Sequence, residues 1–319
     1  MGDGVRKTRR MSHRPSWSTL PTLVTDWVAG LLGAPVVSAV SQAGGFSPAS
    51  ADRVVAANGA RAFVKAVHAD HNPRTPEMHR TEARVAAAFP PGFPAPALLG
   101  CLDADGWVAL AFADVDGRHP RTPWTADELD ATLGTLGELA RMGTPAPIDD
   151  LPTLPEQLAD DFAAWERVAA DPPADLDPWL AERLPELTER AAAGAAALAG
   201  DTLVHMDVRA DNVLLDHAGR VWVLDWPWVC RGAAWADRLL LLYSAVDDDN
   251  LDAIDARVDA VLAEHGLAPD VGTDVLSGFV SFFVDAARRP GFAGGGDVVT
   301  HRRQRAAYTV PLLRKRIGG

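Results

Sequence analysis

The stretch from His205 to Asp225 holds the residues whose types and spacing best suit phosphoryl-transfer chemistry. It contains the pattern His-x-Asp-x-x-x-x-Asn, formed by His205, Asp207 and Asn212, and it ends in Asp225. Phosphoryl transfer needs one acid to orient or deprotonate the attacking hydroxyl, and oxygen ligands to hold a metal ion. Carboxylate and carboxamide oxygens are hard ligands that suit Mg²⁺ carrying the phosphates of a nucleotide.

These side chains can act together only if the chain folds back between Asn212 and Asp225. Two short apolar runs, Val213–Leu215 and Val221–Leu224, flank a glycine-containing turn. That pattern predicts a β-hairpin, which returns Asp225 to the neighbourhood of Asp207. Any one Asp or Asn taken alone also fits a cap or a turn, so the interpretation depends on the whole string.

A glycine-containing loop and one lysine are the candidate phosphate-binding features of the first part of the chain. The loop, Gly44-Gly45-Phe46-Ser47, follows a predicted strand at residues 36–40 and lacks the Walker pattern. Glycine backbone can approach phosphates closely, although a Gly-Gly hairpin turn fits the same residues. Lys65 lies in a predicted strand at residues 60–67, which an Asn-Gly turn joins to a strand at residues 52–57. Burying the charge of a lysine in an apolar strand costs free energy unless an acidic group pairs with it. The alternative is that the strand lies at an edge of the sheet and the lysine points to water.

A predicted helix supplies the candidate partner of Lys65. Thr75-Pro76 predicts the helix start, with Thr75 as the N-cap, and the helix extends to about residue 89. Its Glu82 precedes an apolar stripe and is the candidate counter-ion for Lys65, with a surface glutamate as the alternative. Residues 98–99 and 107–112 are predicted strands, and a hinge segment follows them.

The remainder of the chain is predicted to be mainly helical. A capping box, Thr125-x-x-Glu128, predicts a helix to about residue 142. Further helices are predicted near residues 154–168, 176–183, 185–198 and 238–246. Several acidic side chains could bind a cationic substrate, although a solvated helix face is the simpler explanation of them. They are Glu156, Asp160, Asp161, Glu166 and Asp247-Asp248-Asp249.

The composition is that of a globular protein with room for two lobes. The chain has 319 residues, of which 48% are hydrophobic and 23% charged. The net charge of −13 argues against a nucleic-acid partner and permits a cationic substrate. No apolar run reaches the ~18 residues that a membrane span requires. The two cysteines, Cys101 and Cys230, make neither a disulfide framework nor a zinc site.

The basic N-terminal segment lacks the apolar core of a secretory signal. We therefore expect a cytoplasmic protein with no membrane partner. Residues 1–16 are expected to form a disordered basic tail, with Met11 as an alternative start.

Taken together, these features resemble the aminoglycoside phosphotransferase family, a choline-kinase-like branch of the protein-kinase-like fold, over nearly the whole chain. The resemblance implies an α+β fold with two lobes. A β-rich N-terminal nucleotide-binding lobe with one main helix would span residues 17–113. A mostly helical catalytic and acceptor-binding lobe would span residues 114–319. The matching features are Gly44-Gly45-Phe46-Ser47, Lys65, Glu82, Pro94-x-Pro96, Leu99-Gly100, Asp116-Gly117, the His205–Asn212 motif, Asp225 and Gly232…Asp237.

The resemblance implies a catalytic role for each residue of the central motif. Asp207 would orient the acceptor hydroxyl as the catalytic base. Asn212 and Asp225 would bind Mg²⁺, and Asp237 would brace the catalytic loop. Arg209 and Asp211 stand where many family members carry His and Gly, a departure that we expect to be tolerated because neither position is a phosphate or metal group.

The resemblance also implies a nucleotide site for ATP or GTP. Lys65 would hold the α- and β-phosphates, tethered by Glu82, and the Gly44–Ser47 loop would position the nucleotide. The hinge backbone at Phe112, Ala113 and Val115 would take the purine, with Phe112 and Phe46 flanking it. Core packing is the alternative for Phe112.

The activity that the resemblance implies is O-phosphotransfer to a small molecule. The γ-phosphoryl group of ATP or GTP would move to a hydroxyl of an antibiotic of aminoglycoside, peptide or nucleoside type, giving resistance or self-protection. One alternative is a metabolic kinase for a sugar, amino alcohol or amino acid. Another is a nucleotide-binding pseudokinase, which the presence of Lys65, Asp207, Asn212 and Asp225 disfavours. The segment at residues 144–187, which normally builds the acceptor site, matches no subfamily.

Overall fold

The computed structural model describes residues 15–42, 48–72, 74–289 and 298–318, which divide into two compact units. Of the described residues, the first unit contains those up to His79 together with Leu99–Asp114, and the second contains Arg80–Leu98 and those from Val115 onwards. The predicted lobe boundary after residue 113 stays a prediction. The predicted phosphate loop, Gly44–Ser47, and all but the last two residues of the predicted tail lie outside the described residues. Within the described part of the chain, no helix is long and apolar enough to cross a membrane.

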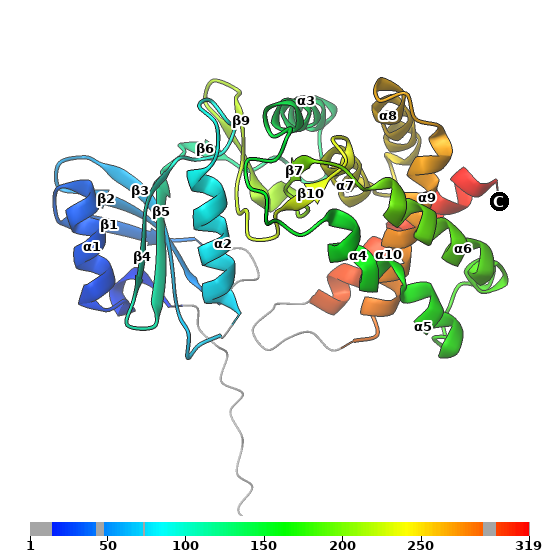
Figure 1. Ribbon diagram of the computed structural model, residues 1–319, viewed down its shortest axis with the longest axis horizontal. Coiled ribbons are helices and arrows are strands. Elements are labelled where there is room, and N and C mark those ends of the chain that lie inside the picture. Colours follow the sequence, from blue (N-terminus) through cyan, green and yellow to red (C-terminus); the bar gives the residue numbers. More distant parts are fainter. Residues whose placement is uncertain (1–14, 43–47, 73, 290–297, 319) are drawn as a thin grey trace, which may run out of the picture. The chain divides into compact units, whose positions relative to one another are not determined.

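The first unit is built on a five-stranded sheet with strand order β1-β2-β3-β5-β4 (Figure 1). The helix α1 (Thr22–Leu32) covers one face of this sheet, because the side chains of Val28 and Leu32 pack against Val54 and Val64. The strands are β1 (Val36–Ser41), β2 (Ser50–Ala56), β3 (Arg61–His68), β4 (Leu98–Ala104) and β5 (Trp107–Ala113), and a 3-10 turn, η1, spans Trp17–Thr19.

Lys65 lies on the central strand of this sheet. It pairs with Ala51 of β2 on one side and with Leu110 of β5 on the other. The alternative of a lysine on an edge strand is therefore wrong. The predicted β2–β3 hairpin is present, and Gly59 in its turn has a φ of 85°, which only glycine adopts without strain.

The helix α2 (Thr75–Ala87) has a different cap from the predicted one. The side-chain oxygen of Asn72 accepts hydrogen bonds from the N–H groups of Arg74 and Thr75 at 2.9 and 3.2 Å. Thr75 itself is already helical. Asn72 therefore accepts from two N–H groups at the start of α2, and Thr75 is the first helical residue instead of the N-cap.

The second unit is mostly helical and contains two small sheets, β10-β7 and β6-β8-β9. Its strands are β6 (Gly117–Arg118), β7 (Thr202–Val204), β8 (Val213–Asp216), β9 (Val221–Val223) and β10 (Cys230–Gly232), and a 3-10 turn, η2, spans Ala210–Asn212. Its helices are α3 (Ala126–Met142), α4 (Leu154–Phe162), α5 (Ala164–Ala170), α6 (Pro178–Ala197), α7 (Ala236–Ala245), α8 (Leu251–Glu264), α9 (Pro269–Ala286) and α10 (Val298–Ile317).

The helix α9 packs against α4, α5, α6, α8 and α10 (Figure 1). Small residues on α9 allow this close approach, and Gly278 lies directly against the ring of Phe162. The fully buried Trp165 donates its Nε1–H to the carbonyl and hydroxyl oxygens of Ser277, both at 3.1 Å. A single hydrophobic core joins these helices to the β8–β9 hairpin.

The predicted capping box of α3 does not form. The Glu128 carboxylate instead accepts hydrogen bonds from Arg118 Nη2 at 2.7 Å and from the Arg121 N–H at 2.8 Å. A capping box opens α4, where Thr153 and Glu156 each accept a hydrogen bond from the other's backbone N–H, at 3.3 and 2.8 Å. Glu156, a candidate ligand for a cationic substrate, therefore has a structural role.

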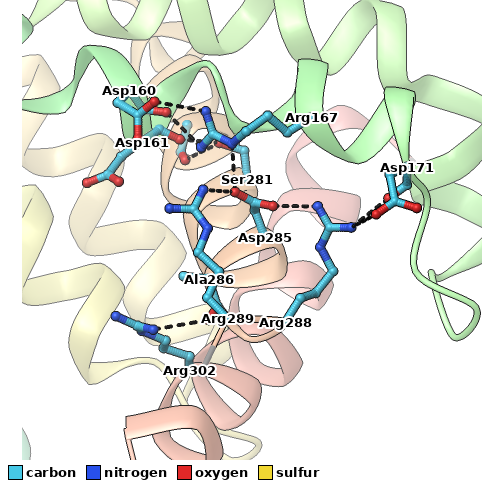
Figure 2. A network of polar contacts seen from close by, with 11 residues as sticks. Asp160, Asp161, Arg167, Asp171, Ser281, Asp285, Ala286, Arg288, Arg289 and Arg302 are labelled. Carbon is cyan, nitrogen blue, oxygen red and sulfur yellow. Dashed lines mark hydrogen bonds and ion pairs between the residues drawn. The ribbon is translucent and has the colours of Figure 1, made fainter. Parts of the chain in front are cut away.

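A network of arginines around one buried carboxylate ties α5 to α9. Figure 2 shows Asp285, whose side chain is 3% exposed, between Arg167, Arg288 and Arg289. Arg167 Nε donates to Asp285 at 2.8 Å. Burial by itself raises the pKa of Asp285, but hydrogen bonds from the three arginines lower it below its usual value overall.

Two further acidic residues of α4 adjoin this network. Asp160 accepts a hydrogen bond from Arg167 at 3.1 Å, so this candidate substrate ligand already has a structural partner (Figure 2). The backbone carbonyl of Asp161 accepts from Ser281 Oγ at 3.0 Å, and burial raises the pKa of the Asp161 carboxyl.

Candidate active site

His205 connects the loop after β7 to the β8–β9 hairpin, and it is fully buried. Its Nδ1 accepts a hydrogen bond from the Asp207 N–H at 3.2 Å, so Nε2 carries the ring proton and donates to Leu224 O at 2.7 Å. The Leu224 N–H in turn donates to Asn212 O at 2.8 Å. The loop that carries Asp207 is therefore fixed to the strand end that carries Asp225.

Asn212 and Asp207 are bonded to each other through the amide of Asn212. Asn212 Nδ2 donates to Asp207 O at 2.8 Å and to Asp207 Oδ2 at 3.2 Å. Because Nδ2 of Asn212 donates to Asp207, the atom of the Asn212 side chain that can bind a metal ion is Oδ1. Burial is the main cause of the raised pKa of Asp207, and the charge of Asp225 adds to it. The hairpin thus brings Asp207, Asn212 and Asp225 together in the second unit.

Two residues of this site have a left-handed backbone, namely Met206 with a φ of 69° and Asp225 with a φ of 64°. Such a conformation costs a non-glycine residue about 1–2 kcal/mol. The carboxylate of Asp237, in the first turn of α7, accepts from the N–H groups of His205 and Met206 at 2.8 and 2.9 Å. These two bonds hold the backbone that leads into Asp207.

Glu82 of α2 supports the residue that follows Asp225. Its side chain is 2% exposed, and Oε1 accepts a hydrogen bond from the Trp226 N–H at 3.2 Å. The Trp226 ring packs edge-on against His205, with ring centroids 4.6 Å apart, and against Phe89 at 5.0 Å. The sequence suggested only Lys65 as the partner of Glu82, and that pairing stays a prediction because Lys65 belongs to the first unit.

The Asp207 carboxylate is suited to accept a proton. Burial raises its pKa to about 6; Asp225 and Asp211 also raise it, whereas Arg209 opposes them. Arg209 Nη1 donates to Asp207 Oδ1 at 2.8 Å. A carboxylate with a pKa near 6 is ionised at neutral pH and is more basic than an ordinary aspartate.

Asn212 and Asp225 suit a magnesium site in which the protein supplies only a few of the ligands. Among the described residues, no three His, Cys, Asp or Glu side chains are arranged to hold a metal ion, so an all-protein cage is absent there. Mg²⁺ commonly binds through one or two carboxylates, keeps several waters and takes its other ligands from substrate phosphates. One carboxylate and one carboxamide oxygen match that requirement.

Four of the candidate nucleotide-binding residues are described by the structure, namely Lys65, Phe112, Ala113 and Val115. All of them except Val115 belong to the first unit. Lys65 Nζ lies 5.8 Å from the centroid of the Phe112 ring, which is a cation–π distance. Phe112 itself is buried, as the core-packing alternative requires. Ala113 ends β5, and Val115 is the first residue of the next segment of the second unit.

Two ion pairs of Asp114, at the hinge, were not predicted from the sequence. The Asp114 carboxylate, 3% exposed, accepts from Arg53 Nε of β2 at 2.7 Å and from Arg61 Nε of β3 at 2.8 Å. These arginines outweigh the effect of burial and keep the pKa of Asp114 below its usual value. The contacts depend on strand register, which no local pattern in the sequence reveals.

Comparison with known proteins adds a family and a fold to this geometry. The family model described as the phosphotransferase enzyme family, APH, matches residues 43–270. No curated protein sequence matches significantly.

Solved structures of antibiotic-modifying enzymes have the same fold. A thermostable mutant of aminoglycoside phosphotransferase APH(4)-Ia, in a ternary complex with ADP and hygromycin B, aligns with a TM-score of 0.58 and 13% identity, covering 92% of this chain and 97% of that one. Spectinomycin phosphotransferase APH(9)-Ia, in complex with ADP and spectinomycin, has a TM-score of 0.56, 11% identity and coverages of 92% and 97%. Amicoumacin kinase hAmiN, in complex with AMP-PNP, Ca²⁺ and Ami, has values of 0.53, 13%, 90% and 93%. The predicted α+β kinase-like fold class is confirmed.

Proposed function

Since this chain belongs to the phosphotransferase enzyme family, we propose that it transfers the γ-phosphoryl group of ATP or GTP to a hydroxyl of a small molecule. The observation that carries the proposal is the convergence of Asp207, Asn212 and Asp225 around the buried His205. A carboxylate that can orient and deprotonate a hydroxyl, beside two hard oxygen ligands for a metal ion, is the combination that phosphoryl transfer uses.

Each residue has one task in this proposal. Asp207 orients the acceptor hydroxyl and takes its proton as the oxygen attacks the γ-phosphorus. Asn212 Oδ1 and the Asp225 carboxylate hold Mg²⁺, which when bound neutralises charge on the phosphates. Asp237 keeps the loop in place, so that the rate gain comes mostly from positioning and charge stabilisation.

The first unit supplies the nucleotide contacts in this proposal. Lys65 binds the α- and β-phosphates, with Glu82 as its tether, and Gly44, Gly45, Phe46 and Ser47 cover the phosphates. Backbone groups at Phe112, Ala113 and Val115 bind the purine. Support comes from Lys65 on the central strand and from Asp114, which ties the hinge to two neighbouring strands.

The acceptor that we propose is a hydroxylated antibiotic. Three structures of the same fold contain hygromycin B, spectinomycin or Ami together with a nucleotide. Their low identity means that they suggest the class of acceptor to test first, and a sugar, amino alcohol or amino acid comes second.

The test is nucleotide consumption in Mg²⁺ against a panel of hydroxylated antibiotics and metabolites, with the product mass recorded. One product that gains a single phosphoryl group identifies the acceptor. Asp207→Ala should lower kcat at least ~10²-fold and leave nucleotide binding largely intact. Equal turnover by this variant and the wild type would refute the assignment of Asp207.

The metal assignment has a separate test. Asp225→Ala should abolish the Mg²⁺-dependent part of nucleotide binding, because the only carboxylate assigned to the metal is lost. Calorimetric titration of nucleotide with and without Mg²⁺ measures this directly. An unaltered metal dependence would contradict the role of Asp225.

A further inference from the structure

Arg209 contacts the proposed catalytic base directly. Its Nη1 donates to Asp207 Oδ1 at 2.8 Å, while Nε and Nη2 donate to the two oxygens of Asp211 at 3.0 and 2.9 Å. The guanidinium therefore bridges two carboxylates that are four residues apart in the same loop. Its side chain is 27% exposed, so it lies against the loop and still has access to solvent.

The arrangement is more specific than an ordinary surface ion pair. A two-pronged arginine–carboxylate contact fixes the plane and the direction of the guanidinium, which a single contact does not. Asp211 supplies that fixed contact, and the remaining prong is directed at Asp207. The pKa of Arg209 is raised further above its usual value by Asp211 and Asp207, although burial opposes them, so this charge is permanent.

The contact with Asp207 also indicates what Arg209 can reach. A base must lie about 2.6–3.2 Å from the hydroxyl whose proton it takes, and the oxygen of that hydroxyl attacks the γ-phosphorus. A cation bonded to the same carboxylate is thus a neighbour of the phosphoryl group at the moment of transfer. Charge spreads over the equatorial oxygens of that group in the transition state, where a fixed guanidinium stabilises it.

We propose that Arg209 is a catalytic residue that binds the transferring phosphoryl group, and that Asp211 positions it. The inference rests on the proposed function. Before substrates bind, Arg209 pairs with Asp207. In the ternary complex Asp211 still fixes the guanidinium, the Asp207 carboxylate rotates towards the acceptor hydroxyl, and Nη1 donates to a γ-phosphoryl oxygen in place of Asp207 Oδ1.

The chemical step is balanced without any change in Arg209. The bond between the γ-phosphorus and the β–γ bridging oxygen breaks, and a bond from the γ-phosphorus to the acceptor oxygen forms. The hydroxyl proton goes to Asp207, and the nucleoside diphosphate leaves. Arg209 keeps its protons throughout and contributes only charge and hydrogen bonds.

The experiment compares a nucleotide with and without the γ-phosphoryl group. Calorimetry gives Kd for ADP and for AMP-PNP in Mg²⁺, for the wild type, Arg209→Ala, Arg209→Lys and Asp211→Asn. A charge-assisted hydrogen bond is worth about 1.5–3 kcal/mol, so Arg209→Ala should reduce the preference for AMP-PNP over ADP by about 10–150-fold. Asp211→Asn should reduce it less, and Arg209→Lys should retain part of it.

Arg190→Ala is the matched control. Arg190 also bridges two carboxylates, with contacts of 3.1 Å to Glu186 and 2.8 Å to Asp274, but on α6 and α9. Its loss should leave the ADP to AMP-PNP ratio at the wild-type value. If Arg209→Ala does not fold, the ratios of Arg209→Lys and Asp211→Asn carry the test.

The outcomes separate this inference from the proposed function. A wild type that binds both nucleotides, with the same ratio in all Arg209 and Asp211 variants, overturns the inference and leaves the proposed function standing. Tighter AMP-PNP binding or a higher kcat in Arg209→Ala also overturns it, because Arg209 would then block the base. A wild type that binds neither of these nucleotides, nor GDP and GMP-PNP in their place, refutes the proposed function itself.

Discussion

Replacing Asp237 by asparagine should damage both the stability of the protein and the geometry of the catalytic loop. The Asp237 carboxylate accepts from the His205 and Met206 N–H groups at 2.8 and 2.9 Å. Asparagine has the same shape, but only one of its two terminal atoms accepts a hydrogen bond. Its NH₂ group would face one of the two N–H donors, and that donor would lose its partner.

The size of the effect follows from these contacts. A hydrogen bond to a charged group is worth about 1.5–3 kcal/mol, and the second bond weakens when the charge is removed. Burial raises the pKa of Asp237 to about 6, so removing the charge also removes a desolvation cost and offsets part of the loss. We expect a net loss of about 1–3 kcal/mol in the free energy of unfolding.

The catalytic effect should exceed the effect on stability. Met206, with its φ of 69°, directly precedes Asp207 and would relax once the bond to its N–H is lost. A displacement of about 1 Å in a catalytic group can cost ~10²-fold in rate, so kcat should fall at least ~10-fold. KM for the nucleotide should change little, because the hydrogen bonds of Asp237 are to the backbone of the catalytic loop.

Urea unfolding followed by tryptophan fluorescence measures the first effect, and steady-state kinetics measures the second. The control is Asp130→Asn, which removes an exposed ion pair with Arg257 at 2.8 Å. That pair should contribute no more than about 1 kcal/mol. If Asp237→Asn and Asp130→Asn had equal stability and wild-type kcat, the bracing role of Asp237 would be refuted.

Two further predictions concern the helical unit. Gly278→Ala should destabilise the protein by about 1–3 kcal/mol because the new Cβ would overlap the ring of Phe162, whereas Gly134→Ala, with nothing within 4 Å, should stabilise it by about 0.5–1 kcal/mol. Urea unfolding of both variants checks this, and shifts of the same sign would contradict the packing argument. The lowered pKa of Asp285 means that its carboxylate stabilises the fold above the unfolded-state value of 3.8, and that this stability is lost as pH falls through the folded-state pKa. Asp285→Asn should therefore weaken the protein by about 1–3 kcal/mol at pH 7 and flatten the decline in stability below pH ~4, which unfolding measured across pH 3–7 detects.

Short-range features of the fold could be predicted because local patterns specify them. The Asn58-Gly59 turn between two apolar runs gave the β2–β3 hairpin, and the apolar runs around the Asp216–Gly219 turn gave β8 and β9. Most of the predicted helices and strands agree with the structure to within a few residues. The predicted helices at residues 176–183 and 185–198 are instead one helix, α6, and the predicted helix at residues 154–168 is divided into α4 and α5.

Capping was less predictable, because several side chains compete for the same donors. The pattern at Thr125-x-x-Glu128 satisfies the sequence rule, but Arg118 and the Arg121 N–H capture the Glu128 carboxylate. Asn72 likewise replaces Thr75 as the cap of α2. A side chain selects its partner by free energy among all groups within reach, and the sequence shows only the local ones.

Residue order alone sets the spacing of His205, Asp207, Asn212 and Asp225, and that spacing predicts the chemistry proposed for this part of the chain. The β8–β9 hairpin returns Asp225 to the loop that carries Asp207, whatever the position of the other elements. It could be predicted because both of its strands belong to one short stretch of sequence.

The electrostatic environment of that stretch depends on how the chain packs. The pKa of Asp207, the left-handed Met206 and the hydrogen bond from Trp226 to Glu82 depend on groups that distant elements bring near. Even the hydrogen bond from Arg209 to Asp207, two residues away, depends on the backbone conformation of the loop and could not be predicted from the sequence. The burial of each group and the direction of its hydrogen bonds determine these interactions. Both are properties of the packed chain and not of residue order.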